Sequence, residues 1–121
     1  MIRDTNLRLR IRRTLKRVVE LLVQLDYAGL ERISGGVRLR AADIEAGVVD
    51  YGRTLTYPPT SAYEDIDVVR IDGTVPPEYS IRFRLFTEEE SRPDLELQAT
   101  FVDDNPAEDV MRVELENILV P

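Results

Sequence analysis

The stretch DYGRTLTYPP spans residues 50–59, and the spacing of the apolar side chains changes across it. Before this stretch, apolar residues recur every three or four positions, which is typical of helices with one buried face. After it they alternate with polar residues, which is typical of strands. Pro58 and Pro59 fix φ and remove two backbone donors, so a helix ends here and an extended link begins. The sequence therefore predicts helices first and strands afterwards.

The longest predicted helix runs from about residue 5 to about residue 25. Asp4 or Thr5 can cap its first turn, because a short oxygen side chain satisfies the free N–H groups there. Its apolar residues recur at spacings of 4, 3, 1, 3 and 3, which places them on one helical face. They are Ile11, Leu15, Val18, Val19, Leu22 and Leu25.

Two shorter helices are predicted before the double proline. The first lies within residues 26–36 and ends at a glycine pair that begins at Gly35, since glycine adopts the positive φ favoured after a helix. The second lies within residues 38–52, and its start is left open because Arg40 stands where Ser or Asp would form the cap. Gly47 inside it costs about 1 kcal/mol relative to alanine, which indicates close packing against a neighbouring element.

The alternation predicts four strands, at residues 66–71, 79–86, 95–102 and 111–120. In the last one the phase changes at Glu116 and Asn117, which is the effect of the extra residue in a β-bulge. Ion pairs are expected across neighbouring strands, from Arg82 and Arg84 to Glu96, Glu114 and Glu116. The predicted fold class is α+β: a single domain over residues 1–121, with N-terminal helices packed on one face of a curved antiparallel sheet of about four strands.

Missing residue types narrow the range of functions. The chain of 121 residues contains neither cysteine nor histidine. Disulfides, Ser-His and Cys-His nucleophile systems and ordinary zinc sites are therefore excluded, and no metal or organic cofactor is expected. No run approaches the ~20 apolar residues of a membrane span, and a cytoplasmic location is expected. Proton transfer by Asp, Glu or Tyr stays open, but the composition does not favour an enzyme.

The formal charge of −7 is unevenly distributed. Residues 1–40 hold 10 basic and 4 acidic side chains, a balance of +6, whereas residues 41–121 hold 6 and 19, a balance of −13. A concentrated field of one sign raises association rates and selects a partner of the opposite sign. A basic protein partner is therefore one interpretation, and a solvated basic helix beside an acidic sheet edge is the other. The net charge disfavours nucleic acid, and no nucleic-acid-binding motif is present.

Two acidic loops are the predicted partner-binding sites. TEEE at residues 87–90 and DDNPAED at residues 103–109 each fall between two predicted strands. Alternate turns of a meander lie at opposite ends of its sheet, so the two loops are expected to form separate patches. The candidate residues are Glu88, Glu89 and Glu90 in the first loop and Asp103, Asp104, Glu108 and Asp109 in the second.

The order of these elements carries a resemblance. A long helix, a short helix, a third helix ending in DYG and a sheet closing on RVELENILV are similar to the nuclear transport factor 2-like cone fold of ketosteroid isomerase and SnoaL. More narrowly, DYGRTLTYPP followed by a strand, TEEE and RVELENILV resembles a family of small bacterial domains with no assigned function. This narrower resemblance covers roughly residues 15–120. It implies a fold, and no catalytic motif accompanies it.

The cone fold implies a pocket at its wide end, beside residues 52–63, where an Asp base and Tyr donors serve the enzymes of this type. The inward strand positions here are almost wholly aliphatic or Phe, which favours a filled core and a structural role for the proline corner. The strand residues predicted to be buried beneath the helix that carries Val18 and Leu22 are Ile81, Phe83, Leu97, Phe101, Val113 and Leu115. Arg53 is expected to pair with Asp50 or Asp65, and Tyr57 and Tyr63 are expected at the rim. The candidate pocket residues are therefore Tyr57, Tyr63, Asp65 and Arg53.

Two functions are weighed. The favoured one is a small acidic protein-binding module, an immunity-type or regulatory protein that occludes a partner such as a basic toxin. The alternative is a small-molecule-binding or enzymatic cone-fold domain with its pocket near residues 52–65. The sequence predicts neither the identity of the partner nor the oligomeric state.

Overall fold

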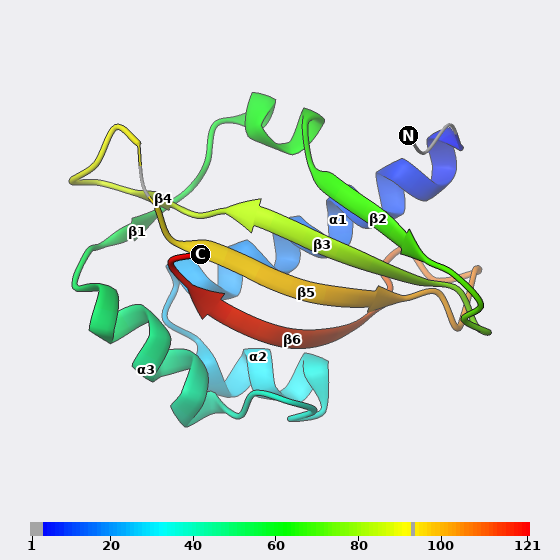
Figure 1. Cartoon of the computed structure of the whole chain (residues 1–121), viewed down its shortest axis with the longest axis horizontal. Helices are drawn as coiled ribbons and strands as arrows, with labels where there is room; N and C mark the ends of the chain where they lie inside the picture. The colour runs from blue at the N-terminus through cyan, green and yellow to red at the C-terminus, as the bar shows by residue number, and fades with distance from the viewer. Residues whose placement is uncertain (1–3, 93) are drawn as a thin grey trace.

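The computed structural model describes residues 4–92 and 94–121, so residues 1–3 and 93 of the predicted domain lie outside it. The architecture is α+β, as predicted. The helices come first in the chain: α1 spans Thr5–Val23, α2 spans Tyr27–Ser34 and α3 spans Ala41–Tyr51. Figure 1 shows α1 behind the larger sheet, with α2 and α3 along the edge formed by its last strand, β6 (Arg112–Leu119).

Helix α1 begins at the predicted cap. The Asp4 carboxylate accepts a hydrogen bond from the Leu7 N–H at 3.1 Å, and this satisfies one free donor of the first turn. The helix ends at Val23, two residues before the predicted end. Its buried face includes five residues of the predicted apolar stripe and two polar side chains, Arg10 and Thr14. Leu25 was wrongly placed in the stripe: it lies beyond the end of the helix and is 60% exposed.

Helix α3 begins without a capping side chain from Arg40. The Asp43 carboxylate, one turn further on, accepts a hydrogen bond from the Arg40 N–H at 3.0 Å. The helix therefore starts directly after Arg40, at the position that the sequence left open. A Cβ placed on Gly47 would lie 3.0 Å from the backbone oxygen of Ile118 in β6. The predicted close packing at Gly47 is therefore confirmed, and only glycine allows α3 to approach the strand this closely.

The larger sheet has four antiparallel strands in the order β2-β3-β5-β6. The register contains the predicted bulge: Gln98 faces Asn117 whereas Ala99 faces Leu115, which leaves Glu116 as the extra residue. The alternation of apolar side chains on β6 resumes in the opposite phase after it, as the sequence indicated. Before β6 the strands are β2 (Asp67–Ile71), β3 (Glu78–Arg84) and β5 (Glu96–Val102).

A second, two-stranded sheet was not predicted. Strand β1 (Leu55–Thr56) pairs antiparallel with β4 (Phe86–Thr87), and a 3₁₀ helix, η1 (Thr60–Glu64), follows the double proline. The predicted strand at 79–86 is therefore interrupted at Leu85. Strands of two residues carry no periodicity, so the alternation that located the longer strands had nothing to detect here.

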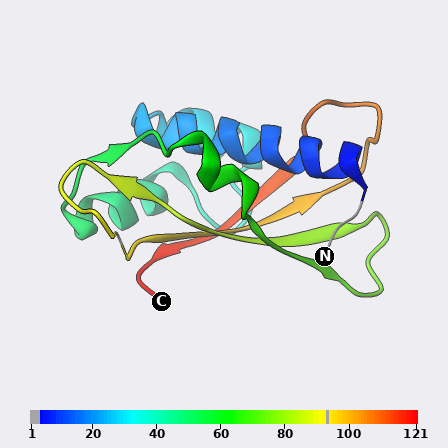
Figure 2. The ribbon, with the colours of Figure 1, turned by 90° about the horizontal axis from the view of Figure 1, so that it is seen from above.

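The core lies between α1 and the inner face of the larger sheet. Figure 2 shows α1 running along one side of this sheet. Eight predicted core side chains are all buried, each with 5% or less of its surface exposed: Val18, Leu22, Ile81, Phe83, Leu97, Phe101, Val113 and Leu115. The inward positions identified from the sequence are therefore confirmed.

The predicted cross-strand ion pairs named the wrong arginines. Within residues 4–92 and 94–121, neither Arg82 nor Arg84 makes an ion pair within 4 Å, although Arg84 faces Glu96 in the register. Arg38, which precedes α3, instead lies 3.1 Å from Glu116, and Arg112 lies 3.0 Å from Glu114. Alternation placed the acids on the correct strands but gave no sign of Arg38, which comes from outside the sheet.

Candidate functional site

The two acidic segments lie at opposite ends of the larger sheet, as predicted. We call residues 88–95 the β4–β5 loop and residues 103–111 the β5–β6 loop. Figure 1 shows the first loop, in yellow, at one end of the molecule and the second, in orange, at the other. The two loops therefore form separate acidic patches.

In the β4–β5 loop the carboxylates of Glu89 and Glu90 accept hydrogen bonds from other residues of the chain. Glu89 accepts hydrogen bonds from the Thr54 N–H at 2.8 Å and from the Thr54 hydroxyl at 3.0 Å. Glu90 accepts from the Tyr51 hydroxyl at 2.9 Å and from the Thr87 hydroxyl at 3.2 Å. These bonds tie the loop to the end of α3 and to the segment before β1. Of the three glutamates predicted as partner contacts, only Glu88 keeps a carboxylate without such a bond among the described residues.

The electrostatics of this loop follow from the same bonds. The hydrogen bond from the Thr54 N–H holds the pKa of Glu89 below its ordinary value, with smaller help from the Thr54 hydroxyl and from the charge of Arg53. The predicted pairing of Arg53 with Asp50 or Asp65 is wrong, since no ion pair within 4 Å joins them in the described chain. Arg53 acts on this loop only at longer range.

In the β5–β6 loop an arginine holds the main chain from inside. Arg10 of α1 donates from Nε to the carbonyl oxygen of Glu108 at 2.9 Å and from Nη2 to that of Asn105 at 3.1 Å. Its Nη1 lies 2.8 Å from Asp103 Oδ1, an ionic contact whose angle does not meet that of a good hydrogen bond. The side chains of Arg10 and Asp103 are only 5% and 15% exposed, so the pair is largely shielded from water. We call these contacts the Arg10 latch.

Thr14 extends the latch to the end of the loop. Its hydroxyl donates to the Arg10 carbonyl oxygen at 2.7 Å and accepts from the Met111 N–H at 2.9 Å. Sequence reasoning missed both residues. A signal was present, because positions 10 and 14 fall beside Ile11 and Leu15 in the stripe that the spacing assigns to the buried face of α1. Polar residues in such a stripe need buried partners.

The latch leaves other acids of this loop facing outward. Asp104 pairs with Arg112 at 2.7 Å, and both side chains are partly exposed. Asp109 is 90% exposed and lies 3.6 Å from the half-exposed Arg13. Glu108, held by its main chain, has an exposed side chain. Asp103 is therefore structural, whereas Glu108 and Asp109 are available to a partner.

The predicted pocket residues come together only in part: Tyr63 and Asp65 both line a smaller cavity of about 270 Å³ beside α1, whose lining includes neither Tyr57 nor Arg53. Tyr57 is exposed, and its hydroxyl is 3.4 Å from the Gln24 side-chain nitrogen. Tyr63 is buried rather than at a rim: its ring stacks on Phe83 at a centroid distance of 5.3 Å. Burial, with a smaller contribution from the charge of Glu20, raises the pKa of Tyr63 to about 12. Tyr63 is therefore an uncharged side chain of the core at neutral pH.

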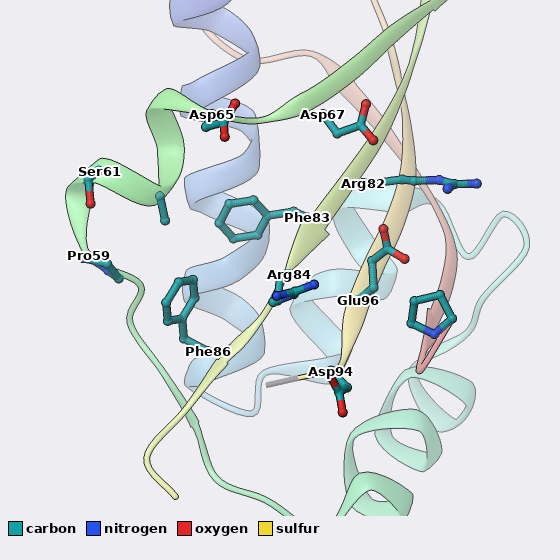
Figure 3. Close-up of a pocket in the computed structure, with 12 residues that line it drawn as sticks. Pro59, Ser61, Asp65, Asp67, Arg82, Phe83, Arg84, Phe86, Asp94 and Glu96 are labelled. Carbon is teal, nitrogen blue, oxygen red and sulfur yellow. The ribbon is translucent and has the colours of Figure 1, made fainter. Parts of the chain in front are cut away.

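A cavity of about 580 Å³ does lie beside the predicted segment. Asp65 lines it, as does Ser61 of η1, and Figure 3 shows Phe83 and Phe86 on the side of the cavity facing η1. Asp65 and Asp67 lie together at one end, above Phe83. The cavity thus combines apolar walls with charged groups, but no Tyr reaches it to assist an Asp base.

Two features are absent from the described residues, a metal-binding cluster and a membrane-spanning helix. Residues 4–92 and 94–121 contain no group of three or more acidic side chains arranged to hold a metal ion. In the same part of the chain, none of the helices combines the length and the apolar character needed to cross a bilayer.

The comparisons with known proteins give a family. The model described as "Domain of unknown function (DUF7668)" matches residues 19–121. The chain belongs to this family. No curated protein and no solved structure matches it. The match contains both acidic loops and the cavity but begins after Arg10 and Thr14, so the basic half of the latch lies outside it.

Proposed function

We propose that this chain is an acidic protein-binding module that contacts a basic partner through the β5–β6 loop. The Arg10 latch carries the proposal. Because the latch fixes the main chain at Asn105 and Glu108, the exposed carboxylates of Glu108 and Asp109 are held in place with only one long, exposed ion pair of their own, from Asp109 to Arg13 at 3.6 Å. A loop ordered in advance loses less entropy on binding than a mobile loop does.

The charge of the chain supports a basic partner. The balance of −13 over residues 41–121 attracts a positive surface over long range, which raises the rate of encounter. The β4–β5 loop is the weaker candidate, since a partner there would compete with Thr54 and Tyr51 for Glu89 and Glu90. An immunity-type or regulatory role in the cytoplasm of a bacterium, in which the module covers a basic toxin, is the form of this proposal that we favour.

The proposal is tested with paired baits. Tagged wild-type protein and the variant Glu108→Arg/Asp109→Arg would be incubated with lysate of the source cells at two salt concentrations. We expect a basic protein to be retained by the wild type, more at low salt, and lost from the variant. Glu88→Arg, an exposed change in the β4–β5 loop, is the matched control and should retain the protein. Equal retention by all three baits would contradict the proposal.

A second candidate function is small-ligand binding in the cavity beside η1. Its volume of about 580 Å³ is the observation that favours it, because ligand pockets typically measure about 300–1,000 Å³. The lining combines Phe83 and Phe86 with charged side chains of both signs. An enzymatic form of this function has less support, since Tyr57 and Tyr63 lie outside the lining.

The cone-like form of the fold is also a proposal. The long α1 before two shorter helices and the bulged β6 support a nuclear transport factor 2-like arrangement. A bulge increases local twist and bends a strand, which is one source of the curvature that such a sheet needs. An experimental structure in which the four-stranded sheet is flat would rule this arrangement out.

A further inference from the structure

The cavity beside η1 lies at a gap in strand pairing. Strands β3 and β4 form one line from residue 78 to residue 87, interrupted at Leu85. Strand β3 pairs with β2 only as far as Arg82, which lies opposite Asp67. Strand β4 pairs with β1 from Phe86, which lies opposite Thr56, to Thr87. Between β1 and β2 the chain turns away through the double proline and η1. A short stretch of strand edge is thereby left without a neighbour.

Arg84 presents its main chain to this gap. It faces Glu96 in β5, while the next residue, Leu85, donates its N–H to the Leu95 carbonyl oxygen of the same neighbouring chain segment. In an antiparallel ladder, bonded and non-bonded pairs alternate, so the N–H and C=O of Arg84 point away from β5. Arg84 lines the cavity, and within the described residues no hydrogen bond to its N–H or C=O is found on that side.

The cavity walls and rim add charges of both signs. Asp94 and Glu96 line the cavity as well, and Figure 3 shows Glu96 beside Arg84. The other four charged side chains are Asp65 and Asp67, which lie at one end, and Arg82 and Arg84 from the neighbouring β3. None of these four side chains makes an ion pair within 4 Å in the described part of the chain. The half-buried ring of Phe86 supplies an apolar surface between the strand and η1.

We propose that the cavity binds a short peptide in extended conformation, which pairs with Arg84 as a missing piece of strand. An extended residue carries its N–H and C=O on one side, at the spacing needed to exchange two hydrogen bonds with Arg84. An amino terminus near Asp65 and Asp67 and a carboxylate near Arg82 or Arg84 match the charges of a zwitterion. This inference rests on the second proposed function, not on the β5–β6 loop.

The test uses the full-length chain, labelled with ¹⁵N, and the dipeptides Ala-Phe and Phe-Ala. With at least one of them, we expect the Arg84 amide signal to shift and its hydrogen exchange to slow, because the amide becomes paired. The same dipeptide with an N-methylated peptide bond should bind roughly tenfold more weakly, since it has lost the pairing donor. Absence of any Arg84 response to both dipeptides at about 10 mM, tenfold above a millimolar Kd, would overturn the proposal.

Two variants locate the binding. Ser61→Trp places a large ring at an exposed position that lines the cavity and should abolish the response. Thr60→Trp makes the same change one residue earlier, at an exposed position outside the lining, and should leave the response intact. Equal binding by the wild type and by Ser61→Trp would place the peptide elsewhere and overturn the inference.

Capped peptides identify the source of the ligand. If acetylated and amidated Ala-Phe shifts the Arg84 amide as the free dipeptide does, the natural ligand is a segment inside a longer chain. If only the free dipeptide does so, the ligand is a small zwitterionic peptide. A non-peptide fragment that binds the wild type but not Ser61→Trp, when no dipeptide binds, would overturn the peptide inference and leave the ligand-binding function standing.

Discussion

The two acidic loops contain similar residues but use them in opposite ways. In the β4–β5 loop the carboxylates of Glu89 and Glu90 accept hydrogen bonds that hold the loop to Thr54 and Tyr51. In the β5–β6 loop Arg10 holds the main chain, so the exposed carboxylates of Glu108 and Asp109 are not needed for that purpose. A count of acidic residues cannot separate these cases. A carboxylate is available to a partner only where another group already fixes the loop.

The largest expected effect is the loss of the Arg10 latch. Arg10→Met should lower the free energy of unfolding by about 3–5 kcal/mol, because Asp103 keeps a shielded charge without its partner. Urea unfolding followed by circular dichroism measures this. Arg17→Met, an exposed change on the same helix, is the control and should cost less than about 0.5 kcal/mol.

A double variant separates charge from packing in the latch. Arg10→Met/Asp103→Asn removes the unpaired charge as well, so it should regain part of the stability lost in Arg10→Met. If Arg10→Met unfolds at the same urea concentration as the wild type, the latch does not hold the loop. The contrast between the two loops would then disappear.

A smaller effect is expected where the β4–β5 loop meets α3. The Tyr51 hydroxyl donates to Glu90 at 2.9 Å and accepts from the Asp94 N–H at 3.0 Å. Tyr51→Phe removes both bonds and should cost about 1 kcal/mol. Tyr57→Phe is the matched control, since its exposed hydroxyl has only a 3.4 Å contact with Gln24. Equal unfolding midpoints for the two variants would mean that Glu90 is free to bind a partner.

Periodicity predicted the parts of the fold that are long enough to show a period. The stripe of α1, the four strands and the extra residue at Glu116 were all visible in the spacing of apolar side chains. The β1–β4 pair was invisible because each strand has two residues. The resemblance implied a pocket near residues 52–65, but periodicity could not give the lining of the cavity, since the cavity forms where this pair and β2 fail to meet.

The sequence predicted where the acidic loops lie, but not which of their carboxylates are free to contact a partner. Alternation placed the acidic loops at opposite ends of the sheet, as the structure does. Which acids are free depends on contacts far apart in the sequence, such as Arg10 with Glu108, 98 residues away, and Thr54 with Glu89, 35 residues away. Arg10 and Thr14 within an apolar stripe are local signs of such contacts.

The pH dependence of the β4–β5 loop tests whether Glu89 works as a structural anion. Its pKa in the folded chain lies below the ordinary value of 4.5, first because of the Thr54 N–H. A lowered pKa stabilises the folded state above the unfolded pKa, and this stabilisation is lost as pH falls through the folded pKa. The wild type should therefore unfold at higher urea than Glu89→Gln at pH 7, and the difference should shrink below pH 4.5. A difference that is constant down to pH 3 would show that the charge is not the cause.

The smallest expected effect compares the loops directly, with equal changes of charge. Glu108→Gln/Asp109→Asn should leave the free energy of unfolding within about 0.5 kcal/mol of the wild type, because Glu108 holds the loop through its main chain and the exposed 3.6 Å ion pair of Asp109 with Arg13 contributes little. Glu89→Gln/Glu90→Gln removes the same two charges but also replaces the charged acceptors for Thr54 and Tyr51 with neutral amide oxygens, which form weaker hydrogen bonds, so it should unfold at lower urea. Both double variants reduce the net charge alike, and general electrostatic repulsion therefore cancels between them. If the β5–β6 variant is the less stable of the two, its acids are structural, and a partner surface at Glu108 and Asp109 loses its physical basis.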